Sequence, residues 1–138
     1  MYKSLCISLL LLGLHVSMVF AGGVEVDELA KSTASWNGTS LPDFGAGETE
    51  VTVLHITVAP DTRLPLHIHP VINVAYMLSG ELTVVSEAGG RKTIRGGDAL
   101  IELVDQQHYG INESSEPAEL VVVYFGKQGL PITVKMQE

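Results

Sequence analysis

Beyond residue 48 the chain is a succession of short apolar runs, each followed by residues that favour turns. None of these runs repeats with the 3.6-residue period of an amphipathic helix. We therefore predict an all-β domain, either a sandwich or a barrel. The first run carries apolar side chains on both faces, which predicts a strand inside the sandwich, and the last is expected at an edge. The predicted strands are 50–58, 71–78, 81–85, 92–94, 99–104, 119–125 and 130–135.

The first twenty-one residues differ from the rest. Lys3 precedes an apolar stretch from Leu5 to Phe20, and Val19-Phe20-Ala21 places small residues at the positions that a signal peptidase requires. The stretch is shorter than the ~20 residues of a membrane-spanning helix. We predict a signal peptide at residues 1–21 and an exported protein, periplasmic or secreted; an uncleaved membrane anchor is the alternative. Cys6 is the chain's single cysteine, so the mature protein would have none.

The remainder of the chain is expected to form an arm and one domain. Residues 22–47 are polar and irregular, with a short helical turn expected at Asp27–Lys31 and Trp36 as the side chain that anchors the arm. Residues 48–138 are expected to form the β-barrel domain. A chain of 138 residues has room for one such domain.

The charge balance excludes two classes of partner. The chain has 16 acidic against 8 basic residues, for a formal net charge of -8. Nucleic-acid binding requires Lys and Arg to neutralise phosphates, and peripheral membrane binding requires a polybasic segment. We therefore expect no nucleic-acid partner, and no membrane partner once the signal peptide is removed.

The histidines carry the most specific chemical signal. His67 and His69 lie two residues apart, so on a strand they point to the same face. His108 follows about forty residues later, where a neighbouring strand could return it to the same place. Neutral imidazoles suit several divalent metals. Taken by itself this spacing leaves two interpretations open, a metal site or two half-exposed histidines on an edge strand. His55 belongs to no motif and is expected on the surface.

The spacing around these histidines resembles the two motifs of the cupin superfamily. In the first motif, His67-x-His69 is followed at the family spacing by Asn73, in place of the usual Glu, and by Gly80. In the second, the family Gly, His and Asn are matched by Gly97, His108 and Asn112, whereas Leu103 and Asp105 replace a Pro and a Gly. The resemblance covers residues 48–126 and points to the small single-domain cupins of type 2.

That resemblance implies a conical jelly-roll β-barrel with a metal inside, and dimers are common in the family. His67, His69 and His108 then look like metal ligands, and Asn73 occupies the place of the fourth. The implied cofactor is a divalent ion, Mn, Fe, Zn or Ni. A former metal site that now binds a ligand without metal is the alternative. Arg63 shares the parity of His67 and is a candidate for holding a carboxylate at the barrel mouth.

Asn73 changes the electrostatics of such a site. Three neutral imidazoles and a Glu leave a divalent ion with a net charge of about +1, whereas an Asn leaves about +2. Restoring the family residue in Asn73→Glu is therefore expected to tighten Mn²⁺ or Fe²⁺ binding, and Asn73→Ala to weaken it only slightly.

Three functions fit these features. The first is a metalloenzyme acting on a small molecule, of dioxygenase, decarboxylase, lyase or isomerase type, because each needs an open metal position. The second is a non-catalytic module that binds a small ligand or a metal. The third is a structural barrel with a vestigial site. The fold alone does not choose among them.

Overall fold

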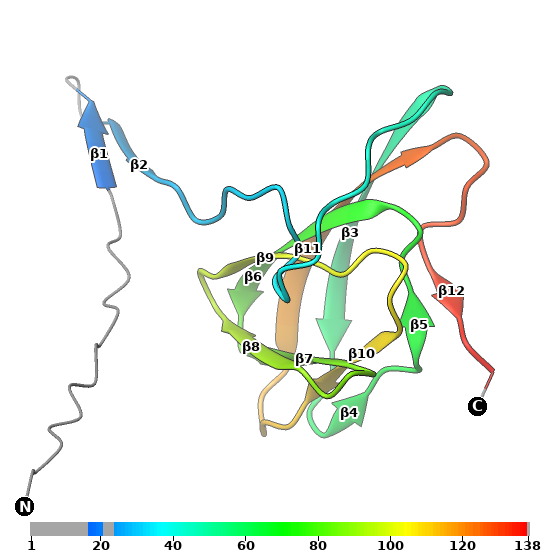
Figure 1. Ribbon diagram of the computed structural model, residues 1–138. Helices are drawn as coiled ribbons and strands as arrows, with labels where there is room; N and C mark the ends of the chain where they lie inside the picture. The colour runs from blue at the N-terminus through cyan, green and yellow to red at the C-terminus, as the bar shows by residue number, and fades with distance from the viewer. Residues whose placement is uncertain (1–16, 21–23, 138) are drawn as a thin grey trace, which may run out of the picture.

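The computed structural model describes residues 17–20 and 24–137 (Figure 1). Of the predicted signal peptide it describes only Ser17–Phe20, as strand β1, which pairs antiparallel with β2 (Val24–Asp27). The signal peptide as such therefore lies outside the described residues and stays a prediction. Within the part of the chain that is described, no helix is long and apolar enough to cross a membrane.

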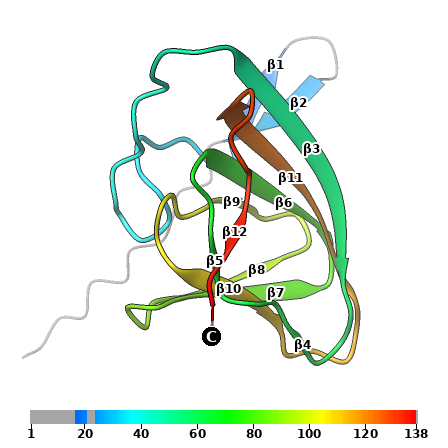
Figure 2. The same ribbon diagram turned by 90° about the vertical axis from the view of Figure 1, so that its right-hand side faces the viewer.

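Two antiparallel sheets make up the domain (Figures 1 and 2). One sheet has the order β3-β11-β6-β9, and the other has the order β12-β5-β10-β7-β8, with β4 also pairing with β10. The all-β prediction is confirmed. The strands are β3 (Thr49–Val58), β4 (Thr62–Arg63), β5 (His67–Ile68), β6 (Ile72–Ser79), β7 (Glu81–Ser86), β8 (Arg91–Arg95), β9 (Ala99–Ile101), β10 (His108–Asn112), β11 (Ala118–Lys127) and β12 (Val134–Lys135).

The core lies between the inner faces of the two sheets. On β11 every second residue is buried, as the period-2 geometry of a strand requires. On β6 the same alternation buries Met77 completely and leaves Tyr76 40% exposed on the outer face. Burying a side chain of this size contributes about 1.5–3 kcal/mol. The core cluster comprises Val58, Val71, Ala75, Met77, Leu82, Val84, Ile94, Leu100, Ala118, Leu120, Val122 and Tyr124.

Strand β3 is not in the interior, contrary to the prediction. It pairs with β11 on one side only, so it forms an edge of its sheet. Its outward side chains Val51 and Val53 are 54% and 62% exposed. Apolar side chains on both faces therefore did not indicate burial on both faces here. Of the predicted edge strand at 130–135, only Val134–Lys135 form a strand, β12, and it does lie at an edge.

Strand β10 was missed and the run at 99–104 was predicted too long. β10 contains Gly110, and its segment His108–Asn112 has little apolar content, so its strand signal is weak. β9 ends at Ile101, and its last register pair with β6 is Ile101 with Val74.

The arm is anchored as expected but has no helix. β2 ends at Asp27, and residues 28–31 are irregular. A single helical turn that buries no side chains does not offset the unfavourable free energy of helix nucleation. Trp36 packs against the core cluster, and its backbone N–H donates to the carbonyl of Ile101 at 3.0 Å.

Candidate metal centre

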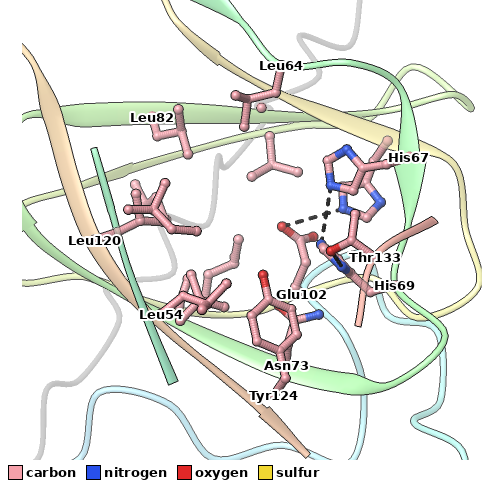
Figure 3. Close-up of a pocket in the computed structure, with 18 of the residues that line it drawn as sticks. Leu54, Leu64, His67, His69, Asn73, Leu82, Glu102, Leu120, Tyr124 and Thr133 are labelled. Atoms are coloured by element: carbon pink, nitrogen blue, oxygen red, sulfur yellow. Dashed lines mark hydrogen bonds and ion pairs between the residues drawn. The ribbon is translucent and has the colours of Figure 1, made fainter. Parts of the chain in front are cut away.

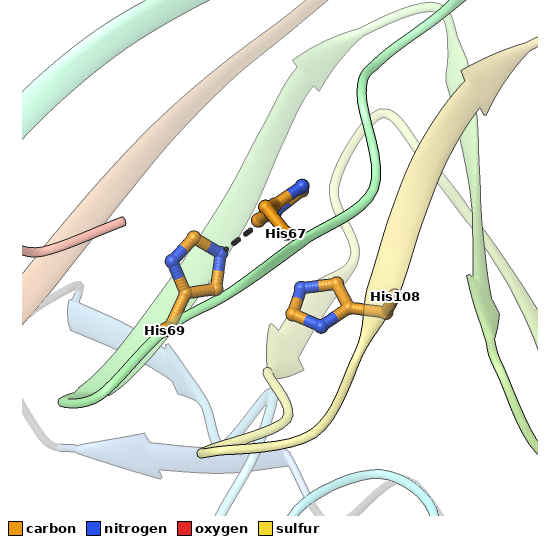
Figure 4. A group of neighbouring side chains, drawn as sticks. All are labelled: His67, His69 and His108. Carbon is orange, nitrogen blue, oxygen red and sulfur yellow. Dashed lines mark hydrogen bonds between the residues drawn. The ribbon is translucent and has the colours of Figure 1, made fainter. Parts of the chain in front are cut away.

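Neighbouring strands bring three histidines to one point inside the barrel (Figure 4). His67 begins β5, and His69 follows two residues later on the same side of the chain. His108 begins β10 and is the antiparallel register partner of His67. The site is thus built on two neighbouring strands of one sheet, and the return of His108 depends on the pairing of β10 with β5.

The three side chains lie close enough to share an ion. The Nε2 atoms of His67 and His69 are 3.2 Å apart, and the ligand atoms of all three residues lie within 4.8 Å of one another. His69 and His108 are buried, with 6% and 1% of their surface exposed, and His67 is half-buried. Imidazole ligands of one ion stand ~2.0–2.1 Å from it, so two of them lie at most ~4.2 Å apart, and a pair 4.8 Å apart would have to approach by ~0.6 Å or more to share the ion.

Each histidine is oriented by a backbone carbonyl. Nδ1 of His67 lies 2.8 Å from the carbonyl of Pro65, Nδ1 of His69 lies 2.8 Å from that of Ile132, and Nδ1 of His108 lies 2.8 Å from that of Gln106. A carbonyl oxygen only accepts, so each Nδ1 carries the proton and each neutral ring presents an Nε2 lone pair.

Those lone pairs point into one space. The 3.2 Å contact between His67 and His69 drawn in Figure 4 then joins two acceptors, which repel unless a proton or a cation lies between them. Nε2 of His108 is buried and has no hydrogen-bond partner among the described residues. Backbone carbonyls that accept from the other ring nitrogen are typical of metal-binding histidines, so the donor set fits a divalent ion.

Burial keeps these imidazoles neutral. It lowers the pKa of His67 and of His108 below the usual imidazole value, and it lowers the pKa of His69 to about 4. The backbone hydrogen bonds oppose this shift but do not cancel it. Neutral imidazole is the form that binds a metal, so the rings need not lose a proton to do so at neutral pH.

Asn73 lines the same cavity as the histidines (Figure 3). It comes from β6 and is 1% exposed, and its Nδ2 has no hydrogen-bond partner within the part of the chain that the structure describes. The structure therefore places Asn73 beside the histidine cluster, and its role as a fourth ligand stays a prediction.

Sequence reasoning missed a buried carboxylate at the site. Glu102 follows β9 and is 7% exposed, and its Oε2 lies 3.9 Å from Nε2 of His108. Burial raises the pKa of its carboxyl above the usual value, while hydrogen bonds from Leu103 and Trp36 oppose that shift. An acidic residue inside the apolar run Ala99 to Val104 was the signal that could have identified it.

The histidines form one wall of a cavity of about 290 Å³ between the sheets (Figure 3). The other walls are mainly aliphatic, with the Tyr124 ring 5.4 Å from the His69 ring. Thr133 and Lys135 also line it. The space therefore suits a small molecule with an apolar body. Its aliphatic lining includes Leu54, Ile56, Leu64, Leu82, Leu100 and Leu120.

The remaining sequence candidates lie outside this cavity. Arg63 is exposed and stacks on Tyr109, with its guanidinium carbon 3.9 Å from the ring centroid, so the expected position at the barrel mouth is wrong. The reason is that the strand breaks between β4 and β5, and parity is lost across the break. His55 is exposed, 3.8 Å from Glu119, as expected. Asn112 is fully buried. Its carboxamide forms hydrogen bonds with the backbone of the loop before β11, which is a structural role.

Comparison with known proteins identifies the family. Residues 54–124 match the Cupin domain family, so this chain belongs to the cupin-domain proteins. The two antiparallel sheets are accordingly a cupin jelly roll, as the resemblance implied. No match was found among curated protein sequences.

Solved structures share this fold at low sequence identity. The DMSP lyase DddQ from Ruegeria pomeroyi DSS-3 aligns with 62% of this chain at 17% identity and a TM-score of 0.55, and the match spans only 43% of that lyase. The oxalate decarboxylase of Lactobacillus farciminis aligns with 64% of this chain at 20% identity and a TM-score of 0.53, over 27% of its own length. The polyketide cyclase RemF from Streptomyces resistomycificus aligns with 68% at 21% identity and a TM-score of 0.52, over 66% of its length. At these identities the matches show the fold alone.

Proposed function

We propose that this protein is a metal-dependent cupin that acts on a small, largely apolar molecule. The observation that carries the proposal is the convergence of three Nε2 lone pairs, each ring held by a carbonyl bond at Nδ1. His67, His69 and His108 would hold a divalent ion, Mn, Fe, Zn or Ni. When bound, that ion supplies Lewis acidity at an open coordination position.

The protein's own groups support an enzyme of dioxygenase, decarboxylase, lyase or isomerase type. The aliphatic walls of the cavity exclude water from a bound molecule, which strengthens every electrostatic interaction there. Glu102, with its pKa raised by burial, and Tyr124 are two groups in the cavity that can hold or move a proton. A lyase, a decarboxylase and a cyclase among the structural matches are compatible with this class of activity.

A non-catalytic module that binds a small ligand or a metal is the second candidate. The continuous aliphatic lining favours it, because binding an apolar molecule requires nothing further from the site. Turnover that is abolished by a chelator and restored by metal supports the enzyme. Ligand-dependent stabilisation without turnover supports the module.

The first experiment is elemental analysis of untagged protein purified from its native compartment. About one equivalent of a divalent transition metal per chain is the expected result. Protein that contains no metal, and to which added Mn²⁺, Fe²⁺, Zn²⁺ or Ni²⁺ does not bind, would remove both metal-dependent interpretations.

Export and assembly belong to the same proposal. Residues 1–21 would be removed during export to the periplasm or the exterior, which intact-mass measurement of exported protein tests. Mature protein that retains Met1 to Ala21 would contradict cleavage. The homodimer that the family resemblance implies is tested by light scattering in solution.

A further inference from the structure

We propose that Glu102, rather than Asn73, provides the anionic ligand of the metal centre, through its Oε2 atom. This inference rests on the proposed metal site and names a residue that the cupin motifs leave unassigned. It follows from the position of Glu102 in the sheet, from how its carboxylate is held, and from the charge of the site.

Glu102 lies directly across from Asn73, which occupies the position of the carboxylate in the family motif. The backbone N–H of Glu102 donates to the carbonyl of Asn73 at 3.1 Å, directly beyond the register pair Val74 and Ile101. Residues opposite each other on antiparallel strands project from the same face, and both side chains line the cavity. The chain thus has an amide at the motif position and a carboxylate on its cross-strand neighbour.

One oxygen of Glu102 is fixed by the protein and the other faces the histidines (Figure 3). Oε1 accepts hydrogen bonds from the Trp36 indole N–H at 3.0 Å and from the backbone N–H of Leu103 at 2.8 Å. Oε2 is turned toward His108. Both oxygens belong to a buried side chain, so the orientation is set before any ion binds.

The distance from Oε2 to the nearest imidazole fits a shared ion. Imidazole nitrogens and carboxylate oxygens bind at ~2.0–2.2 Å, so two ligand atoms of one ion lie at most ~4.4 Å apart. The Oε2 to Nε2 distance of 3.9 Å between Glu102 and His108 satisfies this limit.

A divalent cation would balance the charge of this carboxylate. A buried carboxylate is costly unless it is paired. Among the described residues, Glu102 makes an ion-pair contact with His108, whose neutral ring carries its proton on Nδ1, where it is donated to the Gln106 carbonyl. Three neutral imidazoles, one carboxylate and a divalent ion sum to about +1, the same balance that a Glu at position 73 would give.

The test is calorimetric titration of metal-free protein with Mn²⁺ and, separately, Co²⁺. Glu102→Gln keeps the size of the side chain and an oxygen for Trp36 and Leu103, but removes the charge. We expect it to weaken binding of both ions at least tenfold. The matched control Glu119→Gln makes the same chemical change outside the cavity and is expected to leave affinity unchanged. The double variant Asn73→Glu/Glu102→Gln, which moves the carboxylate to the motif position, is expected to regain affinity.

The outcomes separate this inference from the proposed function. Wild-type protein that binds neither ion would overturn the metal site itself. Wild-type binding that depends on His108 but is unchanged in Glu102→Gln would overturn the role of Glu102 alone. A crystal structure of the wild type soaked in Mn²⁺ does not depend on the folding of any variant. It should place Oε2 of Glu102 ~2.0–2.2 Å from the ion, and a separation above about 3 Å would overturn direct ligation.

Discussion

The indole N–H of Trp36 donates to Oε1 of Glu102 at 3.0 Å. This hydrogen bond connects the N-terminal arm to the back of the candidate metal centre, 66 residues further along the chain. The arm is therefore part of the support of the site, although the family match begins only at residue 54.

Trp36→Phe is expected to lower the free energy of unfolding by about 1–3 kcal/mol, because the buried carboxylate loses one of its two hydrogen bonds. Chemical denaturation of the metal-free protein measures the change. The same substitution in a Glu102→Gln background should cost less, since a neutral acceptor loses less than a charged one. Equal costs in the two backgrounds would show that lost packing, and not the hydrogen bond, explains the effect.

Removing a central histidine should abolish tight metal binding. His108→Ala is expected to weaken Mn²⁺ binding by about a hundredfold or more. Substituting even a residue that only orients a metal ligand lowers metal affinity ~10–100-fold. His55→Ala removes an exposed imidazole outside the cavity and should leave the affinity unchanged. Isothermal titration of both metal-free variants makes the comparison, and equal losses would contradict a site centred on His108.

Stability of the metal-free protein should fall on acidification. The pKa of His69 is lowered from 6.5 to about 4 in the folded chain, so between these values the unfolded state binds more protons. The free energy of unfolding therefore falls as pH drops from 6.5 toward 4. Denaturant titrations at several pH values in EDTA measure this slope.

The control for that slope is His69→Gln, which should show a shallower dependence over the same pH range. The raised pKa of Glu102 acts with the opposite sign, because its folded form holds a proton more readily than its unfolded form. That contribution is common to both proteins and cancels to first order in the comparison. Identical slopes would mean that His69 is not held neutral by the fold.

Two glycines distinguish the stability cost of backbone strain from the cost of a steric clash. Gly80 has a φ of +72°, and an added Cβ would clash with the carbonyl oxygen of Pro117. Gly89 has a φ of +89° with nothing within 4 Å of the same position. Gly89→Ala should cost about 1 kcal/mol from conformational strain alone, whereas Gly80→Ala should cost about 3 kcal/mol or more. Thermal unfolding compares the two, and equal costs would rule out the contact with Pro117 as the cause.

Much of the site could be predicted from local patterns. The period-2 geometry of a strand places His67 and His69 on one face whatever the rest of the chain does. The motif resemblance indicated that His108 returns to them, and the register of β10 with β5 is how it does so. The apolar run around Glu102 marks it as an unusual acidic residue, but its place in the site depends on lying opposite Asn73, and its own segment does not indicate that pairing.

For the strands too, local patterns predicted some features and the tertiary structure decided the others. Met77 and Tyr76 had to face opposite sides of β6, but which of them faces the core depended on the sheet that covers β6. The two apolar faces of β3 predicted an interior strand, yet the order of its sheet leaves β3 at the edge. Parity likewise suggested that Arg63 faces the site until the break between β4 and β5 turned it onto Tyr109.

The sequence by itself determined the all-β class, the turns between strands and the shared face of the His67-x-His69 pair, because these depend on backbone geometry over a few residues. Only the tertiary structure decided that Glu102 lies against His108, that Trp36 holds its other oxygen, and that aliphatic side chains enclose the space before them. The physical reason is that register and sheet order join segments far apart in the chain. They are selected by the packing of the whole core, which no single segment encodes.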